Sequence, residues 1–198
     1  MITNIAKKIV DDLWANGIVE KNDMDVYQYG FFLLLSHALY FFEVILFGII
    51  FDVVLEGIVF YFFFNALRNY SGGFHARKEI TCIFCTTFAM LLSVLAIRLL
   101  EYVESGLIHG VILLCGAVAI FTFSPLDTIE KPLDKRERKH FRRKSIVIYF
   151  IIFAVAMGAY WKNAYGIADA AVISIGLEGI LLLIAKGRQK KTISDANG

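Results

Sequence analysis

The sequence predicts an all-α integral membrane protein with about six transmembrane helices, and three observations lead to this fold class. The 198-residue chain is 58% hydrophobic and has a mean hydropathy of +0.65, whereas a soluble protein is about 45–50% apolar. Its apolar residues form long blocks, and a spanning helix needs roughly 20 of them. Basic residues gather in alternate connections between the blocks. We therefore expect one integral membrane domain over residues 1–198.

The first 24 residues are expected to form an amphipathic helix rather than a cleaved signal peptide. They lack a continuous apolar core and mix acids with bases, unlike a secretory signal. Ile2, Ile5, Ile9 and Leu13 recur near helical spacing, which is typical of a helix with one apolar face. Such a helix lies on the membrane surface or caps the bundle, and both interpretations stay open.

The first apolar block, residues 27–67, is too long for one helix. Gly48, Asp52 and Glu56 interrupt its middle, so we divide it into spans at about 27–48 and 51–67. A four-span alternative, with this block partly re-entrant, stays open. The third and fourth spans are expected within residues 80–124, at about 80–100 and 106–124. The fifth and sixth are expected within 145–186, at about 145–161 and 166–186.

Basic residues in short connections predict the orientation, because they favour the cytoplasmic side. They concentrate in segment 68–79, in a predicted loop over 125–144 with eight lysines and arginines, and in the tail 187–198 together with Lys186, which directly precedes it. Six spans place all three on one side. We therefore expect both termini and the basic loop in the cytoplasm.

The polar run RNYSGGFHARKEITC joins the second and third spans and carries the residue types of a cysteine peptidase. Attack by cysteine on a carbonyl needs a nearby base, and histidine is the usual one. His75 and Cys82 supply this pair. Gly72 and Gly73 precede the histidine, where glycine permits a sharp bend and backbone amides can stabilise an oxyanion.

The spacing of the pair restricts its geometry. On a continuous helix, His75 and Cys82 would lie about 10 Å apart along the axis, too far for the roughly 3 Å contact that the chemistry needs. We therefore expect a bent or re-entrant catalytic loop over 68–82, with Cys82 in the first turns of the third span. Cys85 points about 60° away from Cys82 on that helix.

Three other interpretations compete with catalysis. The His–Cys pair can serve packing alone, as in a structural or lipid-binding membrane protein. Cys82 and Cys85 have the spacing of a zinc-ligand pair, but a second pair is missing, so we expect no metal and no cofactor. A transporter or exporter of a small peptide would explain polar residues within spans, such as His37, Glu43 and Asn65.

The polar run resembles the signature of the accessory gene regulator protein B (AgrB) family of bacterial quorum sensing. The matching positions include the seven-residue step from histidine to cysteine, and chain length and hydropathy are also similar. The resemblance implies a bacterial cell-membrane cysteine endopeptidase that releases the C-terminal tail of an AgrD-like propeptide through an enzyme thioester. A cysteine or serine of the peptide then closes a thiolactone or lactone ring. The matching residues are Arg68, Gly72, Gly73, His75 and Cys82.

The resemblance also sets expectations for partners and for supporting residues. The partners implied are the propeptide and membrane lipids; a homodimer is left open, and nothing points to nucleic acid. Arg68 is expected to bind a carboxylate or the oxyanion, or to anchor the cytoplasmic end of its helix. Glu79, Ser71 and Asn69 are close enough in the sequence to be considered as a third catalytic residue, and none of them stands out. An acidic propeptide tail would suit the basic loop, with Lys131, Lys135 and Arg136 as the residues expected to bind it.

Overall fold

The computed structural model describes residues 1–72, 79–103, 106–126 and 134–196, with side chains as far as Arg188. Within these ranges the chain is helical and contains no strand, apart from an isolated bridge between Gly72 and Leu126. The predicted all-α fold class is confirmed. The elements are α1 (Ile2–Ala15), the short 3-10 helix η1 (Lys21–Asp23), α2 (Met24–Phe51), α3 (Val54–Ser71), α4 (Glu79–Leu100), α5 (Gly106–Phe123), α6 (Lys135–Trp161) and α7 (Tyr165–Ala196).

The long helices have the surface of a membrane protein. Five segments, in α2, α4, α5, α6 and α7, are long and apolar enough to cross a bilayer, with mean hydropathies of 1.7 to 2.3. Large apolar side chains on these helices face outward: Phe42 is 68% exposed, Phe84 72% and Leu114 67%. Such exposure is unfavourable in water and normal against lipid tails. The chain is a multi-pass membrane protein.

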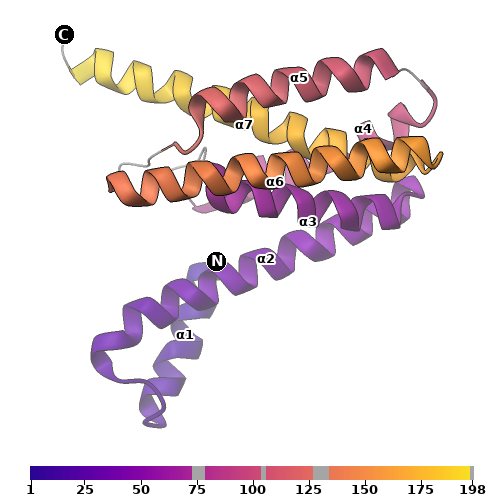
Figure 1. Cartoon of the computed structure of the whole chain (residues 1–198). Helices are drawn as coiled ribbons and strands as arrows, with labels where there is room; N and C mark the ends of the chain where they lie inside the picture. The colour runs from indigo at the N-terminus through magenta and orange to yellow at the C-terminus, as the bar shows by residue number, and fades with distance from the viewer. Residues whose placement is uncertain (73–78, 104–105, 127–133, 197–198) are drawn as a thin grey trace.

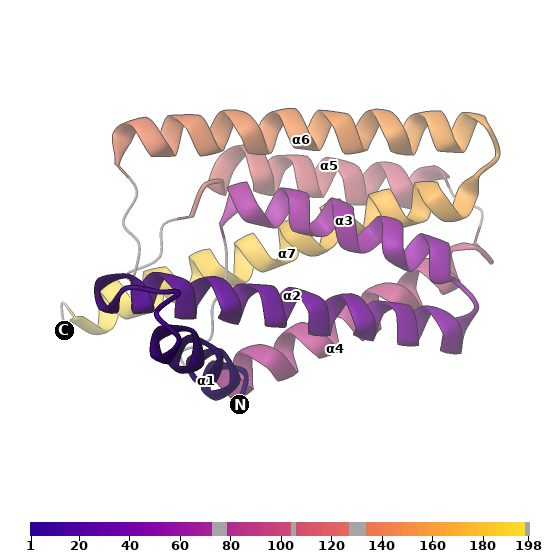
Figure 2. The ribbon, with the colours of Figure 1, turned by 90° about the horizontal axis from the view of Figure 1, so that it is seen from below.

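The remaining long helix, α3, is more polar but lies inside the bundle. Glu56, Asn65 and Arg68 lower its hydropathy, yet Phe60, Phe64 and Leu67 on the same helix are at most 5% exposed. Its 18 residues extend about 27 Å beside α2, α6 and α7 (Figures 1 and 2). Neighbouring helices therefore cover one side of α3, whereas Leu55 and Phe62 on its other side are each 58% exposed. A count of six spans is consistent with this arrangement and stays a prediction.

Helix α7 is the central helix of the bundle. In its apolar segment 56% of the residues are buried, against 17–28% in the other four segments. It contacts α3, α4, α5 and α6. A β-carbon on Gly116 of α5 would lie 2.4 Å from the Ile175 side chain, so the missing side chain permits the close approach of α5 and α7, a common device in membrane bundles.

The N-terminal helix is shorter than expected and has two apolar sides. Ile2, Ala6 and Val10 of α1 are buried, and α1 packs against α2. Ile5 and Trp14 remain 46% and 48% exposed, where a membrane surface would cover them. Figure 1 shows α1 and the start of α2 extending away from the other helices. The segment can therefore pack against the bundle and lie on the membrane surface at the same time.

The predicted basic loop 125–144 differs from the structure, because its second half belongs to α6. The Asp134 carboxylate accepts a hydrogen bond from the Lys135 amide (2.7 Å), and Glu137 accepts one from the Asp134 amide (3.1 Å). This reciprocal cap starts the helix at Lys135. The predicted tail 187–198 is likewise helical as far as Ala196. Hydropathy locates only the apolar part of such helices, so charged extensions were missed.

The two ends of α6 allow a test of the predicted orientation. Six spans with cytoplasmic termini place Lys135 inside the cell and Lys162, which follows Trp161, outside. Cysteine introduced by Lys162→Cys should react with an impermeant maleimide in intact cells, when the native cysteines are replaced. Lys135→Cys should react only after permeabilisation. Labelling of position 135 from the exterior would refute the orientation.

Candidate functional site

The predicted nucleophile, Cys82, lies in the first turn of α4. It comes three positions after Glu79, where the helix begins, and its thiol is free and partly exposed. The first amides of a helix carry partial positive charge, which favours an anion nearby. Cys85 is also free, and it is exposed on the surface. The structure thus agrees with the predicted position of Cys82 in its helix.

A polar strip from α2 and α4 extends into the bundle beside Cys82. The Tyr40 hydroxyl lies against Thr86 and within electrostatic range of Cys82. The Glu43 carboxylate accepts a hydrogen bond from the Thr87 hydroxyl at 2.9 and 3.0 Å. Glu43 had been considered only as evidence for a transporter. Its contact with Thr87 explains a carboxylate within a span without any transport pathway.

Arg68 and Gly72 lie together at the end of α3. The Arg68 guanidinium donates a hydrogen bond to the Gly72 carbonyl (3.1 Å) and lies 3.9 Å from the Glu178 carboxylate of α7. Its side chain is only 19% exposed. Arg68 therefore points into the bundle, which does not favour its alternative role as an anchor at the membrane surface.

Glu178 was missed by the sequence analysis. It is fully buried and accepts a hydrogen bond from the Ser71 hydroxyl. An acidic residue in an apolar span was the available signal, because such residues mark functional positions. Ser71 had been considered as a third catalytic residue; its hydroxyl instead faces Glu178, and the Leu67 and Gly72 carbonyls are alternative acceptors for its single proton.

Glu79, another candidate for the third catalytic residue, holds the N-terminal helix. Its carboxylate accepts hydrogen bonds from the Ile2 amide (2.7 Å), the Thr3 amide (3.2 Å) and the Thr3 hydroxyl (2.8 Å). These contacts cap α1 and fix its first turn beside the first turn of α4. Glu79 thus has a structural role one turn before Cys82.

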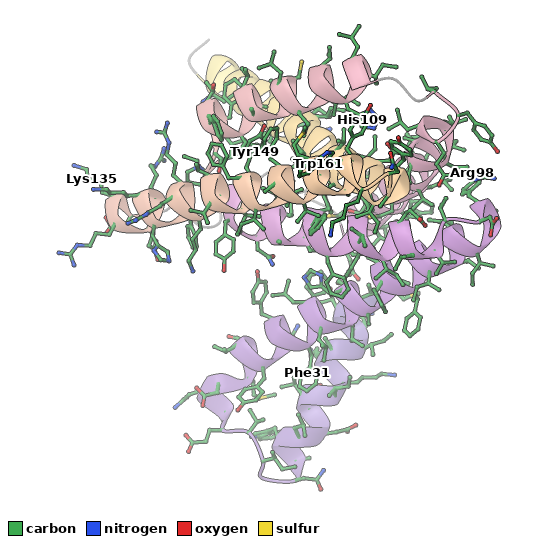
Figure 3. All side chains as sticks on the ribbon, turned by 45° about the vertical axis from the view of Figure 1, so that its right-hand side comes forward. Phe31, Arg98, His109, Lys135, Tyr149 and Trp161 are labelled. Carbon is green, nitrogen blue, oxygen red and sulfur yellow. The ribbon has the colours of Figure 1, made fainter. Side chains whose placement is uncertain are left out.

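Some predicted site residues lie outside the described residues, namely Gly73, His75 and Lys131. The distance between His75 and Cys82 therefore stays a prediction. Lys135 and Arg136 are exposed in the first turn of α6. Figure 2 shows α6 and α4 on opposite sides of the bundle with their first turns at the same end. In Figure 3, Lys135 projects from one end, whereas Arg98 and His109 lie toward the other.

Comparisons with known proteins identify the family of the chain. A family model described as Accessory gene regulator B matches residues 2–182. An AgrB-like protein 2 of Clostridium perfringens (strain 13 / Type A) is 27% identical over 186 residues, covering 88% of this chain and 86% of the relative. An AgrB-like protein of Listeria monocytogenes (strain EGD-e) is 29% identical over 146 residues, covering 69% of this chain and 68% of the relative. No solved structure matches the chain.

Proposed function

Because the chain belongs to the accessory gene regulator B family, which takes part in propeptide processing for quorum sensing, we propose that it is a membrane-embedded cysteine endopeptidase. Its substrate is an AgrD-like propeptide, and its site lies at the cytoplasmic face of the cell membrane. Cys82 is the nucleophile and His75 is the general base. The observation that carries this proposal is the partly exposed Cys82 thiol in the first turn of α4, seven residues after the motif histidine.

The chemistry proceeds in two acyl transfers. His75 takes the thiol proton of Cys82, and the thiolate attacks the carbonyl that precedes the C-terminal tail. The peptide C–N bond breaks, His75 protonates the leaving amine, and a thioester joins Cys82 to the shortened peptide. A cysteine or serine within the peptide then attacks this thioester. The ring forms as a thiolactone or lactone, and the Cys82 thiol is restored.

A position at the membrane suits an intermediate that water would destroy. A thioester keeps enough free energy to form a thiolactone at little cost, so the site has to exclude water. Cys82 lies on a helix whose outward side chains, including Phe84 and Phe88, are 72% and 59% exposed for contact with lipid. Lipid and protein together would then surround the thioester.

The proposal is tested by reconstitution of the wild-type protein with an AgrD-like propeptide whose ring-closing cysteine is changed to alanine. The second transfer cannot occur with this substrate, so the thioester should accumulate. Mass spectrometry should find the adduct on the peptide that contains Cys82, and hydroxylamine should release it. Tail cleavage without an adduct at Cys82 would contradict the mechanism.

Lys131 in the chain before α6, and Lys135 and Arg136 in its first turn, are proposed to attract an acidic propeptide tail. Reversing their charge (Lys131→Glu, Lys135→Glu, Arg136→Glu) should raise KM about tenfold and leave kcat near the wild-type value. The increase should be largest at low salt, where screening is weak. Lys162→Glu, at the other end of α6, is the matched control. An unchanged KM would limit the basic residues to orientation and lipid contact.

A further inference from the structure

Glu178 is a buried carboxylate at the same end of the bundle as the proposed site. Its side chain is 0% exposed, and among the described residues its Oε2 atom has no hydrogen-bond partner. Burying a carboxylate costs several kcal/mol unless neighbours compensate it. Its Oε1 atom is compensated by the Ser71 hydroxyl and by Arg68. Because burying Glu178 costs this much free energy, we expect the residue to have a specific role.

The two partners of Glu178, Arg68 and Ser71, both belong to the end of α3 next to Gly72. Arg68 donates to the Gly72 carbonyl at 3.1 Å, while the Ser71 carbonyl accepts a hydrogen bond from the Leu126 amide at 3.0 Å. Gly72 and Leu126 also form the isolated bridge. The end of α3 is therefore held from α7 by Glu178 and from the segment after α5 by Leu126. We name Arg68, Ser71 and Glu178 the α3–α7 clasp.

We propose that Glu178 is a positioning residue for the peptidase reaction, which acts through Arg68 and Ser71 to fix Gly72. This inference rests on the function proposed above, because Gly72 is three residues before His75 in the chain. In the low-dielectric interior, charge-assisted hydrogen bonds are strong and directional. Glu178 restrains the Arg68 guanidinium, which in turn holds the Gly72 carbonyl in one place.

The central variant is Glu178→Gln, which keeps the side-chain shape and removes its charge. It should lower kcat about 10²-fold, as small misplacements of catalytic groups do, with KM within about twofold of wild type. Rates are measured with the reconstituted full chain and divided by the amount of Cys82 that a thiol reagent titrates. Cys85 and Cys115 are first replaced by alanine, so that only Cys82 reacts.

The same helix offers a matched control. Asp169 is also buried, at 1% exposure, and pairs with His109. It precedes Glu178 by nine residues, about 13 Å along the axis, toward the opposite end of α7. Asp169→Asn should keep the wild-type kcat per titrated Cys82. An equal loss in both variants would show a general effect of removing buried charge and would overturn the inference.

A double-mutant cycle tests whether Glu178 acts through Arg68. Arg68→Gln and Glu178→Gln should each lower kcat, and the double variant should be no worse than the worse single one. Additive losses, or a wild-type kcat in Glu178→Gln, would overturn the inference.

Two further variants cover the case in which Glu178→Gln does not fold and separate the positioning role from the peptidase function. If Glu178→Gln yields no folded protein, Ser71→Ala, which removes one hydroxyl, should lower kcat about tenfold; an unchanged kcat would again overturn the inference. Cys82→Ala separates the two proposals. Should that variant cleave normally, the peptidase function itself is wrong; should it be inactive while Glu178→Gln is fully active, only the positioning role is wrong.

Discussion

Replacement of Cys82 by alanine should abolish release of the propeptide tail while the protein still inserts and folds. The thiol is small and partly exposed in the first turn of α4, so its loss removes little packing. Without the thiolate no thioester can form, and both acyl transfers stop. The measurement is mass spectrometry of the tail and the ring after reconstitution, with the amount of folded protein determined by its elution as one species in detergent.

Cys85→Ala is the matched control for the nucleophile. Cys85 lies three residues further along α4 and is exposed on the surface, so this variant should retain most of the activity. Cleavage at the wild-type rate by Cys82→Ala would exclude a cysteine peptidase that uses this residue. The exporter interpretation would then explain the spans and their polar residues better.

Replacement of the proposed general base, His75→Ala, should also slow cleavage of the propeptide. General base catalysis contributes about 10²–10⁴-fold, so the variant should cleave slower by a factor in this range. A decrease in the cleavage rate much smaller than 10²-fold would indicate that another group is the general base.

Hydropathy predicted the fold class because the exposed faces of α4, α5 and α6 are apolar over their whole spanning length. It was less informative for α3, whose Glu56, Asn65 and Arg68 lower its hydropathy although other helices pack against it. It also placed the start of α6 too late, near residue 145, because the charged turns from Lys135 onward form a helix through the cap at Asp134. Caps and helix packing depend on individual side-chain contacts that a mean hydropathy does not contain.

The site was predicted only where its residues are neighbours in sequence. His75 and Cys82 lie in one polar run, so the motif alone is enough to predict a catalytic pair. Glu178 reaches Ser71 across 107 residues, and no local pattern indicates that α7 packs against the end of α3. An acidic residue in an apolar span indicates that something compensates its charge, but the partner is known only from the fold.

The second large effect is expected from Gly72→Ala, because two separate constraints meet at this residue. Its φ of +73° and ψ of −158° lie in a region essentially limited to glycine. A β-carbon there would also lie 2.5 Å from the Leu126 carbonyl oxygen. Either Leu126 or the end of α3 must then move, which disturbs the residues held by the α3–α7 clasp. We expect kcat to fall about 10²-fold and the free energy of unfolding to fall by about 1–3 kcal/mol.

Gly17→Ala separates the effect of backbone strain from the effect of displacing neighbouring residues. Gly17 has a similar φ of +70°, but nothing lies within 4 Å of the position its β-carbon would take. This variant should lose stability through backbone strain alone and keep the wild-type kcat per titrated Cys82. Thermal unfolding and single-turnover cleavage, measured on both variants, give the two quantities separately. If Gly72→Ala lost only stability, as Gly17→Ala is expected to, the contact between Gly72 and Leu126 would serve folding and not catalysis.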